Sequence, residues 1–192
     1  MESTVAAIVD FSYISIVKKS TKNFLDFRVD KLTDSILNIV SGDSFQTEVS
    51  QVTKADVKHI SNKSGWNFNW EHEFADVSRE VFKLTIVGNP SIIQGLICLT
   101  IETDHIFMNL VESAPFNIGK NKLYEGVAGN LVAFACKMSF QRGLDGYVAF
   151  DAKTKLIPHY AKTLRAHHVG GQRMIITSSA AKFLVVKYFK SE

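Results

Sequence analysis

Short runs of apolar residues separated by polar connectors dominate the middle of the chain. Residues 80–87, 94–102 and 105–112 are three such runs, and their lengths and their β-branched and aromatic residues are typical of strands. The connectors 88–90 (GNP) and 103–105 (TDH) have the length and composition of tight turns. The pattern therefore predicts three consecutive strands in an antiparallel meander.

The C-terminal half changes to a helical period. Apolar residues recur at spacings of three and four between Val127 and Met138, which predicts a helix that ends at Gly143. The elements expected after it are a strand at 147–151, a helix at 155–167 with Pro158 in its first turn, a strand at 173–177 and a last helix capped by Ser178 or Ser179.

These two halves together predict the fold class. An antiparallel meander followed by β-α-β-α-β gives an α/β protein with a mixed sheet and helices on both faces. Upstream of the meander we expect a strand at 47–52 and a helix at 54–60. Thr53 and Asp56 have the spacing of a capping box at the start of that helix.

Residues 1–45 carry weaker signals. Residues 5–17 are compatible with a helix or a strand, 24–29 alternate as an edge strand does, and 41–43 (SGD) signal a turn. We find no chemistry in this stretch. It is expected to be an N-terminal extension packed on a core of residues 46–192, and 192 residues fit one domain, 1–192.

Composition narrows the class of protein. The chain is 46% hydrophobic and 21% charged with a formal charge of +3, and its basic residues are spread out, which argues against nucleic-acid binding. No apolar run approaches the roughly 18 residues of a membrane span. No basic leader precedes the apolar start, so a secretory signal is not expected. Cys98 and Cys136 lie in apolar runs without a disulfide framework or zinc-ligand spacing, which favours a cytoplasmic protein without a metal.

The stretch 106–143 predicts an anion site. An apolar strand ends at Pro115, a polar loop with lysines follows, and a helix begins near Gly126. The first N–H groups of a helix lack partners inside it, and its dipole makes this end positive, so phosphate is a frequent occupant. Gly126, Ala128 and Gly129 leave the backbone nearly bare for close approach.

The stretch 62–76 (NKSGWNFNWEHEFAD) is rich in aromatic residues and contains both tryptophans, Trp66 and Trp70. Two interpretations stay open. The rings are core anchors, as large aromatic residues often are, or they form the rim of a substrate cleft.

The order of elements over residues 45–190 resembles the GNAT superfamily of acyl-CoA N-acyltransferases. In that family, a Gln/Arg-x-x-Gly-x-Gly/Ala loop after the fourth main strand binds the pyrophosphate of coenzyme A through its amides. Here Gly126 and Ala128 match, whereas Leu123 replaces Gln or Arg. The resemblance implies acetyl-CoA or coenzyme A as co-substrate, held by Leu123, Tyr124, Glu125, Gly126, Val127, Ala128, Gly129 and Asn130.

A second family feature is a tyrosine on the helix after the fifth strand, which protonates the departing thiolate. Tyr160 stands at this position, followed by Ala-Lys-Thr-Leu-Arg-Ala rather than the family's x-Lys-Leu-Gly-Phe. The other chemical steps would use a backbone N–H near Leu110 or Val111 to polarise the thioester, and Glu112 as the base for the amine. The alternatives are a solvated carboxylate at Glu112 and a core tyrosine at Tyr160.

The resemblance implies an N-acetyltransferase that moves an acetyl or other acyl group from acyl-CoA to a primary amine by direct attack in a ternary complex. Trp66 and Trp70 would then contact the acceptor. Two non-enzymatic alternatives remain on the same fold: an acyl-CoA-binding module, and a protein-interaction domain that has lost the ligand. Neither nucleic acid nor membrane is an expected partner. The sequence does not fix the oligomeric state, and a homodimer is one arrangement that it allows.

Overall fold

The computed structural model describes residues 24–29 and 35–189. The prediction for 5–17 therefore lies outside the described residues. The described chain contains a seven-stranded sheet in which all neighbouring strands are antiparallel except β6 and β8. The predicted mixed sheet is confirmed. Its strands, in spatial order, are β3 (Thr47–Gln51), β4 (Glu80–Ile86), β5 (Asn89–Ile101), β6 (Ile106–Ser113), β8 (Val148–Asp151), β10 (Arg173–Ile176) and β9 (His167–Gly170).

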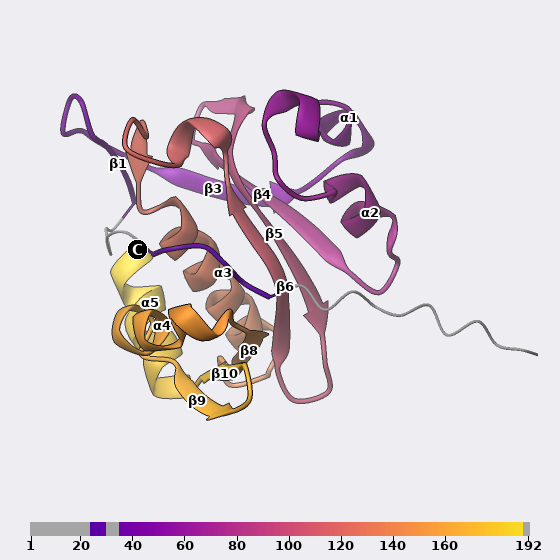
Figure 1. Ribbon diagram of the computed structural model, residues 1–192, viewed down its shortest axis with the longest axis vertical. Coiled ribbons are helices and arrows are strands. Elements are labelled where there is room, and N and C mark those ends of the chain that lie inside the picture. The colour runs from indigo at the N-terminus through magenta and orange to yellow at the C-terminus, as the bar shows by residue number, and fades with distance from the viewer. Residues whose placement is uncertain (1–23, 30–34, 190–192) are drawn as a thin grey trace, which may run out of the picture.

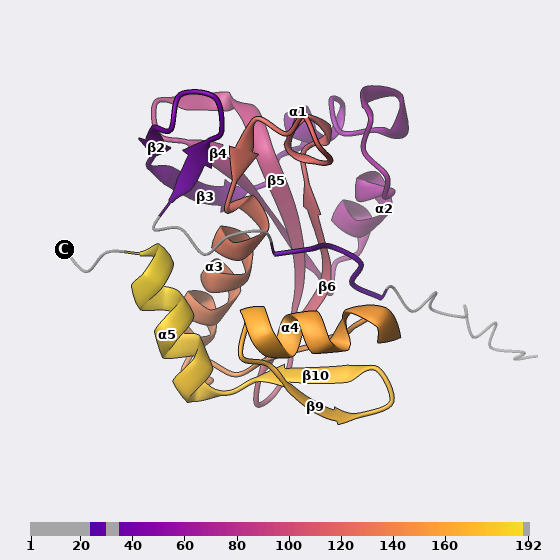
Figure 2. The same cartoon turned by 60° about the vertical axis from the view of Figure 1, so that its left-hand side comes forward.

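Helices cover both faces of this sheet (Figure 1). Helices α1 (Lys54–Val57) and α2 (Trp70–Ala75) lie on one side, and α3 (Val127–Gln141) and α5 (Ser178–Tyr188) lie on the other. The alternation along β5 explains the two layers, because Leu96 and Cys98 belong to the core under α1 and α2, whereas Ile97 and Leu99 belong to the core under α3 and α5. Helix α4 (Ile157–Thr163) lies beside β10 (Figure 2). Short 3₁₀ turns occur at Asn62–Ser64, Pro115–Asn117 and Thr154–Leu156.

A small second sheet connects the N-terminal extension to the start of α3. Strands β1 (Ile36–Asn38) and β2 (Ser44–Phe45) form a hairpin, and β1 also pairs with β7 (Tyr124–Glu125). The predicted turn at 41–43 falls in the hairpin connection and is confirmed. Because β7 leads directly into α3, the pairing of β1 with β7 holds the start of this helix against the hairpin.

Three sequence expectations need correction. The capping box of Thr53 is confirmed, but α1 ends at Val57 rather than at residue 60. The helix expected at 155–167 ends at Thr163, because Arg165 takes a left-handed conformation (φ 54°) that no helix continues through, and the chain then turns into β9. The last helix has Thr177 at its N-cap without a side-chain hydrogen bond, so neither predicted serine caps it.

The parallel strands β6 and β8 separate soon after they meet. They pair only at Ile106–Val148 and Phe107–Ala149, so the rest of β6 has no partner on that side from β8. The N-terminal segment 24–29 enters this opening and runs past β6 above α4 (Figure 2). Its Leu25 forms a parallel bridge with Ala152, just beyond β8. The segment predicted as an edge strand is thus a single bridge at the open edge of β8.

Within residues 24–29 and 35–189, no helix has both the length and the apolar character needed to cross a membrane.

Candidate active site

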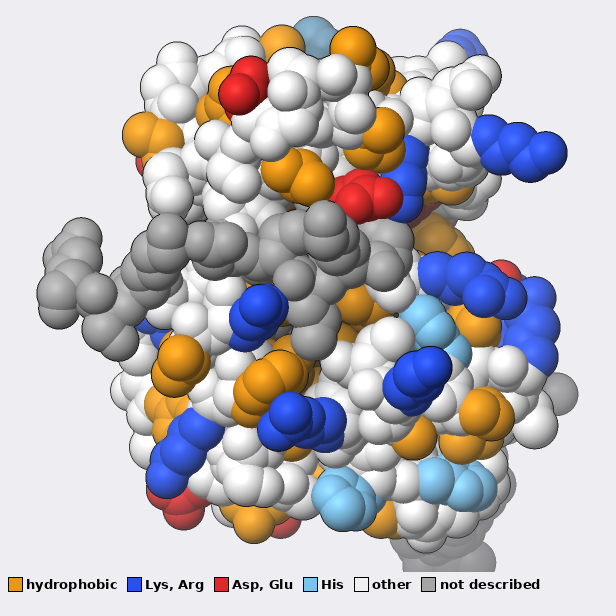
Figure 3. All heavy atoms as spheres, turned by 90° about the vertical axis from the view of Figure 1, so that its left-hand side faces the viewer, with side chains coloured by type: hydrophobic (Ala, Val, Ile, Leu, Met, Phe, Trp, Pro, Cys, Tyr) orange, Lys and Arg blue, Asp and Glu red, His pale blue; other side chains and the backbone are white. Residues whose placement is uncertain are grey.

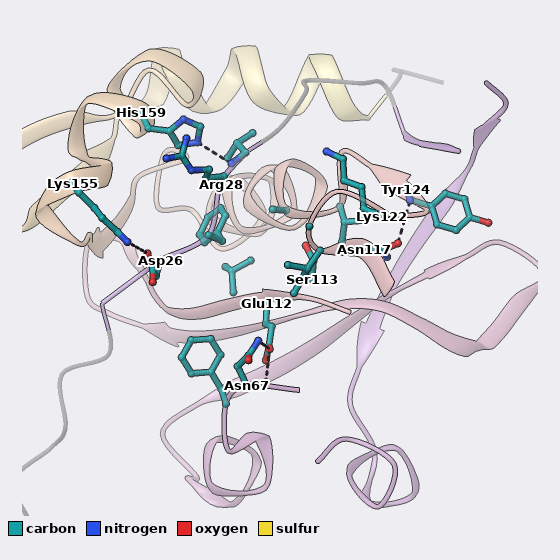
Figure 4. A pocket seen from close by; sticks show the side chains of 18 residues that line it. Asp26, Arg28, Asn67, Glu112, Ser113, Asn117, Lys122, Tyr124, Lys155 and His159 are labelled. Carbon is teal, nitrogen blue, oxygen red and sulfur yellow. Dashed lines mark hydrogen bonds and ion pairs between the residues drawn. The ribbon is translucent and has the colours of Figure 1, made fainter. Parts of the chain in front are cut away.

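A cavity of about 770 Å³ lies where β6 and β8 separate (Figure 4). Its walls come from the N-terminal segment, the aromatic loop, the end of β6, the loop before β7, the first turn of α3, and the region around α4. Figure 4 shows Glu112 and Asn67 on one side of β6 and Arg28, His159 and Lys122 on the other. The cavity therefore has access to groups from both faces of the sheet.

The first turn of α3 presents main-chain donors that have no partner within the helix to this cavity. Gly126 is the N-cap with φ 87°, a left-handed conformation that favours glycine, and it supplies no side chain to cap the helix. The Asn130 N–H donates to the Gly126 carbonyl at 2.9 Å, so the amides of Val127, Ala128 and Gly129 have no acceptor within the helix. Val127 and Ala128 line the cavity. This end of α3 suits an anion.

Strand β6 directs another main-chain donor to the cavity. The Ala114 N–H, just past β6, donates to the Gln94 carbonyl on β5 at 2.8 Å. Main-chain groups alternate in direction along a strand, so the Val111 N–H points away from β5 into the opening, whereas that of Leu110 points toward β5. Val111 lines the cavity, and the Leu110 side chain is buried in the core under α1 and α2. Of the two residues considered for polarising a carbonyl, the geometry favours Val111.

Glu112 is the carboxylate that lies deepest in the site. Its side chain is 3% exposed, yet it lines the cavity. One oxygen accepts hydrogen bonds from the main-chain N–H (2.7 Å) and side-chain amide (2.9 Å) of Asn67, and the other accepts one from the Trp70 indole N–H (2.7 Å). These donors hold the carboxylate in one orientation. The alternative of a freely solvated carboxylate does not describe this residue.

Tyr160 lies behind the N-terminal segment rather than on the cavity wall. It is fully buried, and its hydroxyl donates to the Phe27 carbonyl at 2.7 Å. Its ring packs edge-to-face on Phe150, with centroids 5.3 Å apart, and is tilted against Phe27 at the same distance. Burial raises the pKa of Tyr160. To reach a ligand in the cavity, the hydroxyl has to leave the Phe27 carbonyl.

The two tryptophans are buried in the core under α1 and α2. Trp70 is 1% exposed, and its ring meets Trp66 edge-to-face at 6.5 Å between centroids. Neither lines the cavity, whereas Asn67 and Phe68 between them do. The burial favours the core-anchor interpretation of the tryptophans, and the aromatic loop reaches the cavity through other residues.

The remaining predicted ligand residues have structural contacts. Leu123 is 44% exposed and does not line the cavity, and Tyr124 and Glu125 pair with β1, although Tyr124 also lines the cavity. Gly129 faces α5 rather than the cavity, because a Cβ there would lie 1.7 Å from the Tyr188 hydroxyl oxygen. The Asn130 side-chain amide donates to the Gly126 carbonyl (3.2 Å), within α3.

Two of the four basic residues that line the cavity were not identified from the sequence. The lysines Lys122 and Lys155 were possible phosphate neighbours in the sequence, whereas Arg28 and His159 were not, and the four come from three separate parts of the chain. Burial, and then the charge of Arg28, lowers the pKa of His159, whose Nε2 accepts the Val29 N–H at 2.9 Å. The alternation at 24–29 was visible in the sequence, but nothing in it indicated where the segment packs.

Cations predominate around this side of the molecule. Figure 3 shows more Lys and Arg than Asp and Glu side chains on the face that carries α4 and α5. Their field favours an anionic ligand over a cationic one.

Within the described ranges, no group of three or more His, Cys, Asp or Glu side chains could hold a metal ion. Cys98 donates to Glu73 at 3.3 Å, and burial raises the pKa of its thiol; the same is true of the pKa of Cys136. Neither thiol has the environment of a nucleophile.

Sequence comparison identifies no relative: no protein-family model matches the chain, and no curated protein matches it significantly. Structure comparison does. The chain is similar to mutant forms of the spermidine/spermine N-acetyltransferase SpeG from Vibrio cholerae (16% identity, 72% of this chain and 97% of that chain, TM-score 0.53). It is also similar to a mutant of the AtaT toxin bound to the C-terminus of the antitoxin AtaR and acetyl-CoA (12% identity, 72% and 97% covered, TM-score 0.52). At these identities the likeness establishes the fold, and the chain has the fold of the GNAT N-acetyltransferases.

Proposed function

We propose that this protein is an acyl-CoA-dependent N-acyltransferase that acts on a primary amine. The observation that carries the proposal is the cavity at the separation of β6 and β8, which is lined by Val127 and Ala128 of the first turn of α3 and by Val111 and Glu112 of β6. Its volume of about 770 Å³ and its cationic lining suit a long, phosphate-bearing co-substrate. Val127 and Ala128 would hold the pyrophosphate of coenzyme A, since their amides are donors without helical partners.

The reaction needs one bond to form and one to break. The amine nitrogen attacks the thioester carbonyl carbon, the carbon–sulfur bond breaks, the nitrogen gives up a proton, and the sulfur takes one up. The Val111 N–H would stabilise the oxyanion that forms at the carbonyl oxygen. Glu112 would accept the amine proton, directly or through a water molecule, because it is the cavity carboxylate on the aromatic-loop side.

The resemblance to the GNAT family assigns to Tyr160 the role of donating a proton to the thiolate. The Tyr160 hydroxyl donates its proton in a hydrogen bond to the Phe27 carbonyl. This hydrogen bond would therefore have to break during the catalytic cycle before the proton could reach the thiolate. The acceptor amine would approach past Asn67, which lies on the side of β6 opposite to Arg28 and Lys122 (Figure 4), and past Phe68, which also lines the cavity. SpeG acts on spermidine and spermine. The cations in this cavity favour an acceptor of lower positive charge than a polyamine.

Binding and turnover test the proposal separately. We expect coenzyme A to raise the melting temperature, because ligand at about 100 times its Kd adds about 2.7 kcal/mol to the free energy of unfolding. Release of free thiol from acetyl-CoA, measured against a panel of primary amines, then reports turnover. No thermal shift at millimolar coenzyme A would exclude the proposed co-substrate.

A second candidate function is acyl-CoA binding without catalysis. The observation in its favour is that both proposed acid–base groups already have partners: Glu112 accepts three hydrogen bonds, and the Tyr160 hydroxyl is held by Phe27. A protein that binds acetyl-CoA but releases no thiol with any amine would support this function over transfer.

A further inference from the structure

The segment from Leu25 to Val29 is fixed to the body of the protein at both ends. The Leu25 N–H donates to the Asp151 carbonyl at 2.7 Å, and the Lys153 N–H donates to the Leu25 carbonyl at 3.1 Å. At the other end, the Val29 N–H donates to His159. Leu25 and Val29 are buried in the same core as α3. The segment therefore forms a wall of the cavity that hydrogen bonds and buried side chains hold in place.

Strand-like alternation decides which side chains of this wall face outward. The apolar residues at its two ends turn into the core, so Asp26 and Arg28 turn the other way, and both line the cavity. Asp26 is already paired with Lys153 and, at 3.6 Å, with Lys155. In the part of the chain that the structure describes, no carboxylate lies within ion-pairing distance of Arg28. Its guanidinium is thus available to an anion in the cavity.

The position of Arg28 is relevant to Leu123, which stands where the GNAT loop motif has Gln or Arg. The Leu123 side chain is 44% exposed and outside the cavity, so it contributes nothing to an anion there. Arg28 and Lys122 lie on opposite sides of the cavity (Figure 4), and the first turn of α3 lines it as well. A guanidinium presents parallel N–H donors in a fixed plane that match two phosphate oxygens, a geometry that a lysine ammonium lacks.

We propose that Arg28, carried by the N-terminal segment, binds the diphosphate of the acyl-CoA and replaces the side chain that is missing at position 123. The inference rests on the proposed function, since it names a further residue of the same site. It also gives residues 24–29 a role in ligand binding, where the sequence indicated only packing.

Calorimetry with two ligands tests the role of Arg28. Coenzyme A carries the diphosphate, whereas pantetheine has the same thiol arm and no phosphate. Arg28→Ala should weaken coenzyme A binding by about 10- to 100-fold, the usual worth of a charge-assisted hydrogen bond, and leave pantetheine affinity unchanged. Lys162→Ala is the matched control, because Lys162 is an exposed cation on α4 outside the cavity. It should leave both affinities unchanged.

The possible failures are distinguishable. If the wild type does not bind coenzyme A, the proposed function fails and this inference fails with it. If the wild type binds and Arg28→Ala binds equally well, only the inference is overturned. Equal losses for coenzyme A and pantetheine would mean that Arg28 maintains the shape of the wall, which also overturns it. Arg28→Lys is the conservative variant that controls for a folding defect in Arg28→Ala. Because it retains the positive charge, it should bind coenzyme A more tightly than Arg28→Ala and less tightly than the wild type.

Discussion

The Tyr160 hydroxyl donates a hydrogen bond of 2.7 Å to the carbonyl oxygen of Phe27, a residue 133 positions earlier in the chain. This contact joins the helix after β8 to the N-terminal segment at the cavity. It anchors that segment, and it occupies the proton that resemblance to the GNAT family assigns to the thiolate. Anchoring and catalysis therefore make different demands on one hydroxyl.

Tyr160→Phe separates the two roles. The variant keeps the ring packing on Phe150 and loses the hydrogen bond, so we expect the free energy of unfolding to fall by about 0.5–1.5 kcal/mol. If the tyrosine is also the acid, kcat should fall by about 10²–10⁴-fold. Urea unfolding and thiol release measure the two effects. A destabilised variant with full kcat would leave Tyr160 with the anchoring role alone.

Gly126→Val tests the helix end as the phosphate site. The substitution strains a residue at φ 87° and places a side chain at the N-cap of α3, so coenzyme A should no longer raise the melting temperature. Gly143→Val is the matched control at the other end of this helix. It has a similar φ of 75°, and a side chain there meets open space. The control should lose similar stability and keep the thermal shift; loss of the shift in both variants would contradict the assignment.

Local patterns predicted the elements that carry the site better than the site itself. Short apolar runs located β4, β6 and β8, and the helical period located α3, because all four elements bury apolar side chains in the core. The helix expected at 155–167 instead ends at Thr163, and the chain continues into the hairpin of β9 and β10. The contacts of Arg28 and His159 depend on packing between segments far apart in the chain, which no local period encodes.

Trp70→Ala should act on stability. A buried indole is removed together with its hydrogen bond to Glu112, so we expect the free energy of unfolding to fall by about 3–5 kcal/mol. Phe68→Ala is the companion variant, because Phe68 lines the cavity. It should raise KM for the amine more than KM for acetyl-CoA. A stable Trp70→Ala protein with a raised amine KM would instead place the tryptophan on the acceptor side.

Glu112→Gln should slow the reaction most at low pH. The amine is then mostly protonated, and the variant lacks the carboxylate proposed to take that proton; at higher pH the free amine reacts without it. Glu102→Gln, at an exposed carboxylate just beyond β5, is the control and should keep the wild-type profile. Thiol release measured across pH decides the matter. A Glu112→Gln profile parallel to that of the wild type would remove Glu112 as the base.

His159 predicts how stability responds to mild acid. Burial and the charge of Arg28 lower its pKa in the folded protein below the ordinary value of 6.5. The unfolded chain therefore binds a proton first as pH falls, so the stability that depends on the neutral ring is complete above about 6.5 and is lost below it. A protonated Nε2 also cannot accept the Val29 N–H, which loosens the cavity wall. His159→Gln does not titrate, and its free energy of unfolding should vary less with pH than that of the wild type. Urea unfolding between about pH 5 and 7.5, above the range in which the aspartates titrate, measures the difference. Parallel curves for the two proteins would show that His159 does not set this pH dependence.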